Sequence, residues 1–339
     1  MSDTTLRPAT TISDVARAAR VSPATVSRAL NGTGPVSPAR AARVRDAAER
    51  LGYLPSGPAR ALRRQVNQVW AAIVADIGNP FFTAVVRGIE DGARAEDHRL
   101  VLCNSDEDVD TERSYVDVVV AERMAGVVIA VASPAESDLR PLLDRGIRVV
   151  AVDRRPVDAD VDSVAVDNRL GAETATRHLL EHGSVRVACI TGPERVDTAN
   201  ERLQGYRDAH THLGVPVDRA LVRRADFKLE GGYRTARSLL ESPSPPDALF
   251  VANEPMTIGA LRALRELDRR IPDDVALVGF DDAPWTTLLS PQVTVVSQPA
   301  YEIGRAAAEL LASAGGTGPA RHVVCSPTLI IRESSIRHT

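Results

Sequence analysis

Residues 11–31, TISDVARAARVSPATVSRALN, constrain the fold more narrowly than any other stretch of this chain. Thr11 has the side chain of a helix N-cap, and Asp14, three residues later, completes a capping-box pattern. Apolar residues then recur at helical spacing as far as Ala19. The segment therefore predicts a short amphipathic helix that begins just after Thr11 and ends near Arg20.

A second short helix is predicted directly after this turn. Ser22 is a typical N-cap residue, and Pro23 stands at the first helical position, where its missing N–H costs no hydrogen bond. Val26 and Leu30 then face inward, and the face left outside consists of Ala24, Thr25, Ser27, Arg28 and Asn31. Two helices in this arrangement are typical of a helix-turn-helix, whose second helix enters the DNA major groove. The pattern alone also fits a pair of amphipathic helices in another α-helical domain.

The charge distribution favours the DNA-binding interpretation. Residues 1–64 contain 11 Arg and four acidic residues, a net charge of +7, whereas the rest of the chain carries −11. The overall charge of −4 hides this asymmetry. A small basic head on an acidic body indicates that only the head meets phosphate.

Beyond residue 31 the pattern changes from helices to alternating strands and helices. A third helix is predicted over 37–52, a breaker-rich linker over 53–58 and a short helix over 59–64. Two series of apolar strands separated by helices follow, with strands at 69–77, 100–104, 126–131 and 148–153, then 163–166, 185–191, 248–251 and 276–280. This alternation predicts two α/β lobes with parallel sheets covered on both faces. Because ligands bind beyond the carboxyl ends of such strands, the residues to watch are Asn79, Asp153, Thr191, Asn253 and Asp281.

Composition excludes several classes of protein. Cys103, Cys189 and Cys325 are widely spaced and odd in number, which argues against a disulfide framework or a zinc site. No run approaches 18 apolar residues and no signal-peptide pattern opens the chain, so we expect a cytoplasmic protein without membrane contact. No catalytic triad, phosphate loop or metal-ligand spacing is present. We therefore expect no catalytic residues, no metal and no cofactor, and hence a protein that is not an enzyme.

Eight segments in order resemble the LacI/GalR (lactose/galactose-repressor) family of transcriptional regulators over essentially the whole chain. They are DVARAARVSPATVSRALNG, LGYLPSGPARALR, DIGNPFF, VDNRLGAETATRHLLEHG, RLQGYRDA, VANEPMTIGALRALRE, IPDDVALVGFDD and LIIRESS. The resemblance implies an α plus α/β fold: a three-helix head over 1–55, a hinge helix over 56–66 and a periplasmic-binding-protein-like core over 67–339. We expect lobe 1 at about 67–162 and 295–316, and lobe 2 at about 163–294 and 317–339. Three crossings between lobes are implied, with a return to lobe 1 near Gln298.

The resemblance also assigns residues that contact double-stranded DNA. Pro23, Ala24 and Arg28 match positions that read major-groove bases, and Arg28 has the geometry for a bidentate contact with guanine. Leu62 matches a hinge leucine that the family inserts into the minor groove, although a leucine there could instead pack on the core. The full predicted set is Thr11, Ser22, Pro23, Ala24, Thr25, Ser27, Arg28, Asn31, Tyr53, Ala59 and Leu62. Arg20 departs from the family, which usually has glycine at this turn.

In the core, the resemblance assigns residues that bind a small-molecule effector. Arg202 and Asp281 match polar cleft residues, and aromatic rings are expected against one face of the ligand. The full predicted set is Phe81, Phe82, Asn104, Asp153, Arg202, Phe227, Asn253 and Asp281. Each polar member could instead cap the helix that follows its strand. The set suits a sugar, and a purine or nucleoside remains the alternative.

The resulting prediction is a homodimeric repressor on a near-palindromic operator, regulated by a population shift between two lobe arrangements. A solute-binding receptor without DNA function is the alternative from another class, and the basic helix-turn-helix argues against it. Glu254 replaces an aspartate of the family, a change expected to affect local capping more than ligand contacts.

Overall fold

The computed structural model describes residues 10–31, 34–53, 67–313 and 318–337. The chain divides into two compact units, residues 1–67 and 68–339, each of which is described by itself. The predicted hinge over 56–66, with Ala59 and Leu62, lies outside the described residues.

The first unit, the head, contains three helices around a small apolar core: α1 (Ile12–Ala19), α2 (Pro23–Asn31) and α3 (Pro38–Arg50). The Thr11–Asp14 capping box is present, as predicted, with the Asp14 N–H donating to the Thr11 hydroxyl and the Asp14 carboxylate accepting from the Thr11 N–H. Arg20 ends α1 in the left-handed region, with φ 53°. The turn brings the buried side chains of α1 and α2 together, and this packing offsets the backbone strain at Arg20.

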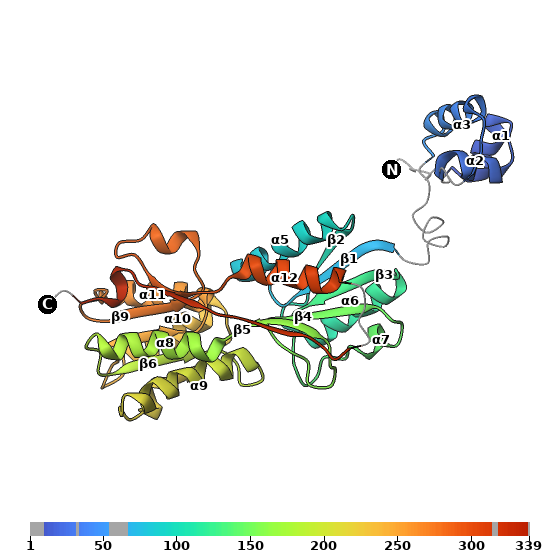
Figure 1. The fold of residues 1–339 in the computed structure, drawn as a ribbon. Helices are drawn as coiled ribbons and strands as arrows, with labels where there is room; N and C mark the ends of the chain where they lie inside the picture. The colour runs from blue at the N-terminus through green and yellow to red at the C-terminus, as the bar shows by residue number, and fades with distance from the viewer. Residues whose placement is uncertain (1–9, 32–33, 54–66, 314–317, 338–339) are drawn as a thin grey trace, which may run out of the picture. The chain divides into compact units, whose positions relative to one another are not determined.

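The second unit, the core, contains two six-stranded sheets, one in each lobe (Figure 1). Lobe 1 has the order β11-β5-β4-β3-β1-β2, and lobe 2 the order β12-β10-β9-β8-β6-β7. The strands of lobe 1 are β1 (Asn67–Val74), β2 (Arg99–Asn104), β3 (Met124–Ile129), β4 (Arg148–Val152), β5 (Asp162–Val166) and β11 (His322–Cys325). The strands of lobe 2 are β6 (Val187–Thr191), β7 (Val222–Arg224), β8 (Ala248–Val251), β9 (Ala276–Phe280), β10 (Thr294–Ser297) and β12 (Thr328–Ile330). Strand β12 runs antiparallel to β10, while the other described pairs are parallel.

Helices cover both faces of each sheet, as the apolar strands predict. In lobe 1 they are α5 (Pro80–Ala95) with α12 (Ala300–Ala312) on one face and α6 (Val109–Ala121) with α7 (Arg140–Leu143) on the other. In lobe 2 they are α8 (Asn168–Glu181) with α9 (Asp197–His212), and α10 (Leu229–Leu240) with α11 (Glu254–Glu266). Short 3-10 turns lie at Arg219–Leu221, Pro284–Thr287 and Glu333–Ser335. No helix within the described ranges is both long and apolar enough to span a bilayer.

Helices α5 and α12 approach each other so closely that glycine is required on both. A Cβ atom at Gly88 would lie 2.1 Å from the Tyr301 carbonyl oxygen, and one at Gly304 would lie 2.0 Å from the Val85 carbonyl oxygen. This packing fixes α12 on lobe 1, as predicted for the chain beyond Gln298.

The predicted boundaries between the lobes were wrong for three strands. Strand β5 belongs to lobe 1 and β10 to lobe 2, although 163–166 was assigned to lobe 2 and 295–297 to lobe 1. Strand β11 pairs with β5 in lobe 1, whereas 317–339 was assigned to lobe 2. Each of these strands leads into or out of a crossing, so its hydrogen-bond partners, rather than its place in the sequence, decide its sheet. The described chain crosses between sheets after β5, β10 and β11, which agrees with the three crossings expected.

Candidate functional site

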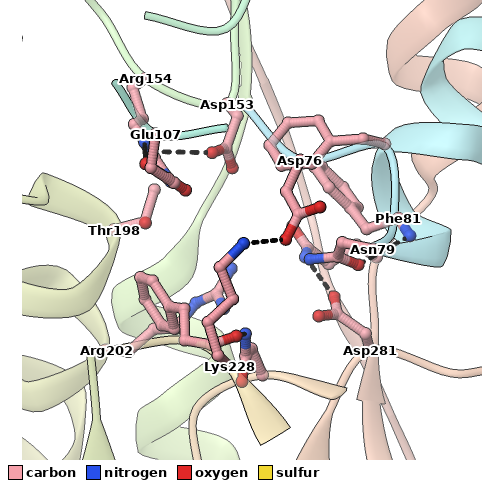
Figure 2. A pocket seen from close by; sticks show the side chains of 14 residues that line it. Asp76, Asn79, Phe81, Glu107, Asp153, Arg154, Thr198, Arg202, Lys228 and Asp281 are labelled. Atoms are coloured by element: carbon pink, nitrogen blue, oxygen red, sulfur yellow. Dashed lines mark hydrogen bonds and ion pairs between the residues drawn. The ribbon is translucent and has the colours of Figure 1, made fainter. Parts of the chain in front are cut away.

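A pocket lies between the two lobes of the core, where the carboxyl ends of strands from both sheets meet (Figure 2). The space between its lining atoms, part of which is open to solvent, amounts to about 450 Å³. Its lining combines aromatic rings with charged and amide side chains: Asp76, Asn79, Phe81, Phe82, Glu107, Asp153, Arg154, Thr198, Arg202, Phe227, Lys228, Asn253, Asp281 and Gln298.

Three phenylalanine rings form the apolar part of this pocket. Phe81 and Phe82 lie in the first turn of α5, with their ring centroids 5.1 Å apart in an edge-to-face arrangement. The Asn79 side chain caps that helix by accepting from the Phe81 N–H. Phe227 comes from lobe 2 in a left-handed conformation, φ 62°. Its ring fits because Gly192 has no side chain; a Cβ there would lie 2.2 Å from the ring atom Cζ.

Arg202 lies beneath the pocket with only 4% of its surface exposed. Its Nε donates to the Asn168 side-chain oxygen at 2.8 Å, and Nη1 donates to the Ala252 carbonyl oxygen at 2.5 Å. The guanidinium stacks 3.7 Å from the centroid of the Phe280 ring. Burial lowers the pKa of Arg202, and the neighbouring carboxylates of Asp281 and Asp153 oppose that effect. The guanidinium is therefore fixed in orientation before any ligand arrives.

Two buried carboxylates face this arginine, and both come from strained backbone. Asp153 follows β4 with φ 65°, and Asp281 follows β9 with φ 81°. Burial raises the pKa of both carboxyl groups, although nearby arginines counteract it. Asp281 accepts a hydrogen bond from the Gln298 side-chain nitrogen at 2.5 Å. Non-glycine residues with left-handed backbone are often held in that conformation at functional sites. In this protein the conformation directs the Asp153 and Asp281 carboxylates into the pocket.

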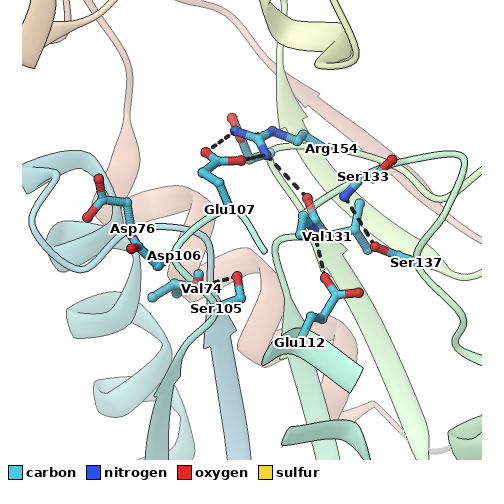
Figure 3. A network of polar contacts seen from close by, with 12 residues as sticks. Val74, Asp76, Ser105, Asp106, Glu107, Glu112, Val131, Ser133, Ser137 and Arg154 are labelled. Atoms are coloured by element: carbon cyan, nitrogen blue, oxygen red, sulfur yellow. Dashed lines mark hydrogen bonds and ion pairs between the residues drawn. The ribbon is translucent and has the colours of Figure 1, made fainter. Parts of the chain in front are cut away.

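A second arginine is held by a bidentate ion pair at the lobe 1 side of the pocket (Figure 3). Arg154 donates from Nη1 and Nη2 to the two Glu107 carboxylate oxygens at 2.6 and 2.8 Å. Although burial alone would lower the pKa of Arg154, the Glu107 carboxylate raises it above its ordinary value. This pairing stiffens the wall of the pocket and leaves Arg154 charged.

An ion-pair cluster of Lys228, Asp76 and Asp106 at the mouth of the pocket joins the two lobes, and Figure 2 shows its Lys228–Asp76 pair. The Lys228 Nζ lies 2.6 Å from Asp76 Oδ2 and 3.1 Å from Asp106 Oδ1. Lys228 precedes α10 in lobe 2, whereas the two aspartates follow β1 and β2 of lobe 1.

Sequence reasoning located half of the lining and misplaced one residue. All of the predicted effector residues line the pocket except Asn104, whose side-chain oxygen accepts from the Ile77 N–H at 2.7 Å and so stabilises a loop. Asn253 lines the pocket and also caps α11 by accepting from the Met256 N–H. The predicted effector set left out seven lining residues: Asp76, Asn79, Glu107, Arg154, Thr198, Lys228 and Gln298. Of these, Asn79 had been expected only as a residue beyond a strand end. Asp76 and Arg154 follow strand ends closely enough for the rule on carboxyl ends to have found them.

The Glu254 side chain makes a local contact outside the pocket lining, but with Trp285 and not as the helix cap that was expected to change. Its Oε1 accepts from the Trp285 indole N–H at 2.5 Å, and burial raises the pKa of its carboxyl group. Trp285, in turn, packs against the apolar cluster beneath α10 and α11, so neither residue lines the pocket.

The head presents a second candidate surface along α2. Pro23, Ala24 and Arg28 are exposed, and the Arg28 Nε donates to the Ala24 carbonyl oxygen. The Ser22 and Thr25 hydroxyl groups lie 2.9 Å apart at the start of the helix. Ser27 departs from the prediction: only 8% of it is exposed, so it does not share the open face. Its position one residue after the buried Val26 turns it towards the helix packing.

The remaining predicted head residues have mixed environments. Thr11 serves as the cap of α1, and Tyr53 packs partly against the head core. Asn31 is the last residue of α2. Within the described ranges, no three His, Cys, Asp or Glu side chains gather as metal ligands would.

Comparison with known proteins places both units. Residues 11–56 match the model for "Bacterial regulatory proteins, lacI family", and residues 176–335 match that for a "Periplasmic binding protein-like domain". The "Ribose operon repressor" of Halalkalibacterium halodurans is 36% identical over 302 residues, and the "HTH-type transcriptional repressor CytR" of Escherichia coli (strain K12) is 34% identical over 304; each alignment covers 89% of both chains. The solved "transcriptional regulator CelR-cellobiose complex" is 32% identical with a TM-score of 0.73, over 97% of this chain and 100% of that one.

Proposed function

We propose that this chain, which belongs to the lacI family of bacterial regulatory proteins, is a homodimeric repressor. A pentose of the ribose type controls its affinity for a near-palindromic operator. In this proposal the sugar binds in the pocket between the two core lobes, and α2 of the head reads the operator. The protein acts by binding alone and returns its effector chemically unchanged.

The composition of the pocket is the observation that carries the sugar assignment. Three phenylalanine rings supply apolar surface for C–H groups, while Arg202, Asp153 and Asp281 supply charged partners for hydroxyl groups. These polar groups are buried and oriented, so a ligand that satisfies them replaces water without reorganising the wall. The relative named as a ribose operon repressor supports a pentose among the monosaccharides.

Exposure supports the predicted DNA contacts of the head. Arg28 has no carboxylate partner among the contacts described for it, and it lies beside the small residues Pro23 and Ala24, which allow close approach to a base. We propose that Arg28 reads guanine, that Ser22 and Thr25 contact phosphate, and that Leu62 enters the minor groove. The basic head also argues against a solute-binding receptor without DNA function.

Exposed apolar side chains on the core support a dimer. On lobe 1, Val101 and Leu102 of the edge strand β2 are 41% and 42% exposed, and on lobe 2 Leu288 is 81% exposed beside Leu289. An edge strand with exposed apolar side chains offers both apolar surface and unpaired backbone groups to a second copy of the chain. A second copy bound through these surfaces brings two heads to one operator, one for each half-site.

Control of DNA binding then follows from a population shift. The effector stabilises the arrangement of the lobes that closes on it. The resulting change in operator affinity is limited by the difference between the effector affinities of the two lobe arrangements. Such couplings amount to about 1–3 kcal/mol, or roughly 5- to 150-fold in operator affinity.

The test is a thermal-shift screen of the full chain against pentoses, hexoses, disaccharides, nucleosides and purines, followed by operator binding with each hit. A pentose at 100 times its dissociation constant adds about 2.7 kcal/mol to the free energy of unfolding. We expect that shift with ribose, and its loss in Arg202→Ala and Asp281→Asn. The proposal is contradicted if no pentose shifts the melting temperature, if both variants keep the shift, or if the recovered ligand has been converted.

A further inference from the structure

The cluster of Lys228, Asp76 and Asp106 occupies the mouth of the pocket, because the exposure of its side chains falls from the outside inwards. The Asp106 side chain is 68% exposed, that of Lys228 is 43% exposed and that of Asp76 only 21%. The lysine therefore extends from solvent towards the interior, and its ammonium group bridges the outer Asp106 and the inner Asp76 of the opposite lobe. Figure 2 shows the bond to Asp76.

The backbone on both sides holds these side chains in place. In lobe 2, the Asp226 carboxylate accepts from the Lys228 N–H at 3.0 Å, and the left-handed Phe227 turns its ring into the pocket while Lys228 reaches across the mouth. In lobe 1, Asp76 Oδ1 accepts from the Gly78 N–H at 2.9 Å, which leaves Oδ2 for the lysine. Each carboxylate oxygen of Asp76 therefore has its own donor.

The side chains of Asp106 and Glu107 point in different directions, one towards the mouth of the pocket and the other towards its interior. Asp106 and Glu107 both have left-handed backbone, φ 52° and 63°, so consecutive side chains take different directions. Glu107 turns inward to Arg154, whereas Asp106 remains at the rim for Lys228 (Figure 3). Partial burial alone would lower the pKa of Lys228, but the two aspartates raise it, so the ammonium group stays charged.

We propose that Lys228 is a specificity-determining residue, which closes the mouth against Asp76 and Asp106 and so restricts the effector to an unsubstituted monosaccharide. This inference rests on the proposed sugar-controlled function. A nucleoside or disaccharide places a second ring beyond the first, and with the lobes closed that ring must pass through the mouth. The second ring then separates Lys228 from both aspartates, and the inner Asp76 carboxylate loses its hydrogen bond from the lysine ammonium group.

The experiment measures dissociation constants of the full-length protein by calorimetry for ribose, cytidine, adenosine and cellobiose. The variants are Lys228→Ala, which opens the mouth, and Lys228→Met, which keeps a long side chain without the charge. Arg234→Ala is the matched control, because Arg234 pairs at 3.9 Å with Asp226 of its own lobe and spans no mouth. Lys228 is partly exposed and outside the apolar core, and melting without ligand checks that each variant is folded.

The result expected is a change in selectivity, not a uniform loss of binding. For wild type and Arg234→Ala, ribose binds and the larger ligands bind far more weakly. In Lys228→Ala and Lys228→Met, the ratio of the cytidine to the ribose dissociation constant falls by about tenfold or more. A purely structural role would weaken both ligands together and leave the ratio unchanged.

Two results would overturn the inference, and they are distinguishable. If wild type binds ribose but the ratio falls less than tenfold in both lysine variants, Lys228 does not determine specificity and the proposed function stands. If wild type prefers a nucleoside or disaccharide, or binds no sugar, the proposed pentose effector fails and the inference fails with it.

Discussion

The two candidate sites use their side chains in opposite ways. On α2 of the head, Pro23, Ala24 and Arg28 are exposed and contribute little to the head core. In the core pocket, Arg202 and Asp281 are buried and already hydrogen-bonded to the protein. The head therefore separates folding from recognition, whereas the core combines them.

This difference has an energetic consequence. An exposed arginine costs little to remove from the folded state, so its substitution acts on DNA affinity alone. A buried arginine paired with carboxylates stabilises both the fold and the ligand, because its removal leaves charges without compensation. Substitutions in the two regions should thus be separable by measuring stability and binding side by side.

The largest effect is expected from Arg202→Ala. Loss of the guanidinium leaves Asp281 buried without its cation and opens a cavity beside Phe280, whereas Asp153 keeps Arg154 at 3.3 Å. We expect the free energy of unfolding to fall by about 3–5 kcal/mol and effector binding to weaken by a further 2–5 kcal/mol or so. Urea unfolding and calorimetry on the same preparation measure the two terms.

Arg207→Ala is the control, since Arg207 lies on the same helix but is exposed. It should change neither quantity by more than about 0.5 kcal/mol. If Arg202→Ala abolished effector binding at full stability, the combination of folding and recognition in the core would not hold.

The next effect is expected from Arg28→Ala. Because Arg28 is exposed and, among the described residues, its one hydrogen bond is a local one to the Ala24 carbonyl, the head should stay folded. Operator affinity should fall by about 1–3 kcal/mol per half-site, the value of a bidentate guanine contact. Titrations of operator and unrelated DNA at several salt concentrations measure both specific and non-specific binding.

Arg43→Ala, on an exposed position of α3, gives the comparison. We expect it to weaken binding to both DNAs equally, through charge alone. An equal loss on both DNAs for Arg28→Ala as well would show that Arg28 contacts phosphate and does not read bases.

Acid should destabilise the core before the head, because all seven histidines lie beyond residue 67. Burial, with a contribution from His182, lowers the pKa of His178 to about 4. The neutral ring, which contacts the Ser335 hydroxyl at 2.8 Å, is thus favoured in the folded state, whereas the unfolded chain binds a proton near pH 6.5. Stability from this group is full above pH 6.5 and decreases as the pH falls towards 4, by about 2 kcal/mol at pH 5.

His178→Gln removes the titrating group and should flatten the decrease in stability between pH 6.5 and 5, as followed by urea unfolding. His212→Gln is the control, since that side chain is 64% exposed. An unchanged pH slope in His178→Gln would assign the acid sensitivity to other buried groups.

The head was predictable from sequence because its determinants are local. The capping box joins residues three apart, and the left-handed Arg20 follows from a turn whose family usually has glycine. Both features depend on backbone rules that operate within one or two turns of a helix. Ser27 was misplaced because the packing of α2 against the rest of the head decides which side chains are buried.

In the core, local rules located strand ends but not the uses of the side chains that follow them. Asn104 stabilises a neighbouring loop instead of lining the pocket, because its side-chain oxygen accepts a hydrogen bond from the Ile77 N–H. Lys228 and Asp76 are 152 residues apart and meet only when the lobes close, so no spacing in the sequence reveals them. The same limit explains the lobe boundaries, because the parallel pairing of β5 with β11 joins segments about 160 residues apart.

The smallest effect is expected from Arg20→Gly. At φ 53° a non-glycine residue costs about 1–2 kcal/mol, and glycine relieves that strain while it increases the entropy of the unfolded chain by about 0.4–1 kcal/mol. The balance should stabilise the head by about 0.5 kcal/mol and leave the core unchanged. Hydrogen exchange of the α1 and α2 amides in the full-length protein, read peptide by peptide, measures the two units separately.

Arg17→Gly is the matched control, because Arg17 is exposed within α1 and has ordinary helical backbone. Glycine there should destabilise the head by about 1 kcal/mol, so the two substitutions three residues apart should have opposite signs. If both speed exchange, the turn at Arg20 is not strained in solution. If Arg20→Gly slows exchange but also weakens operator binding, the arginine side chain contacts DNA, and folding and recognition overlap in the head as they do in the core.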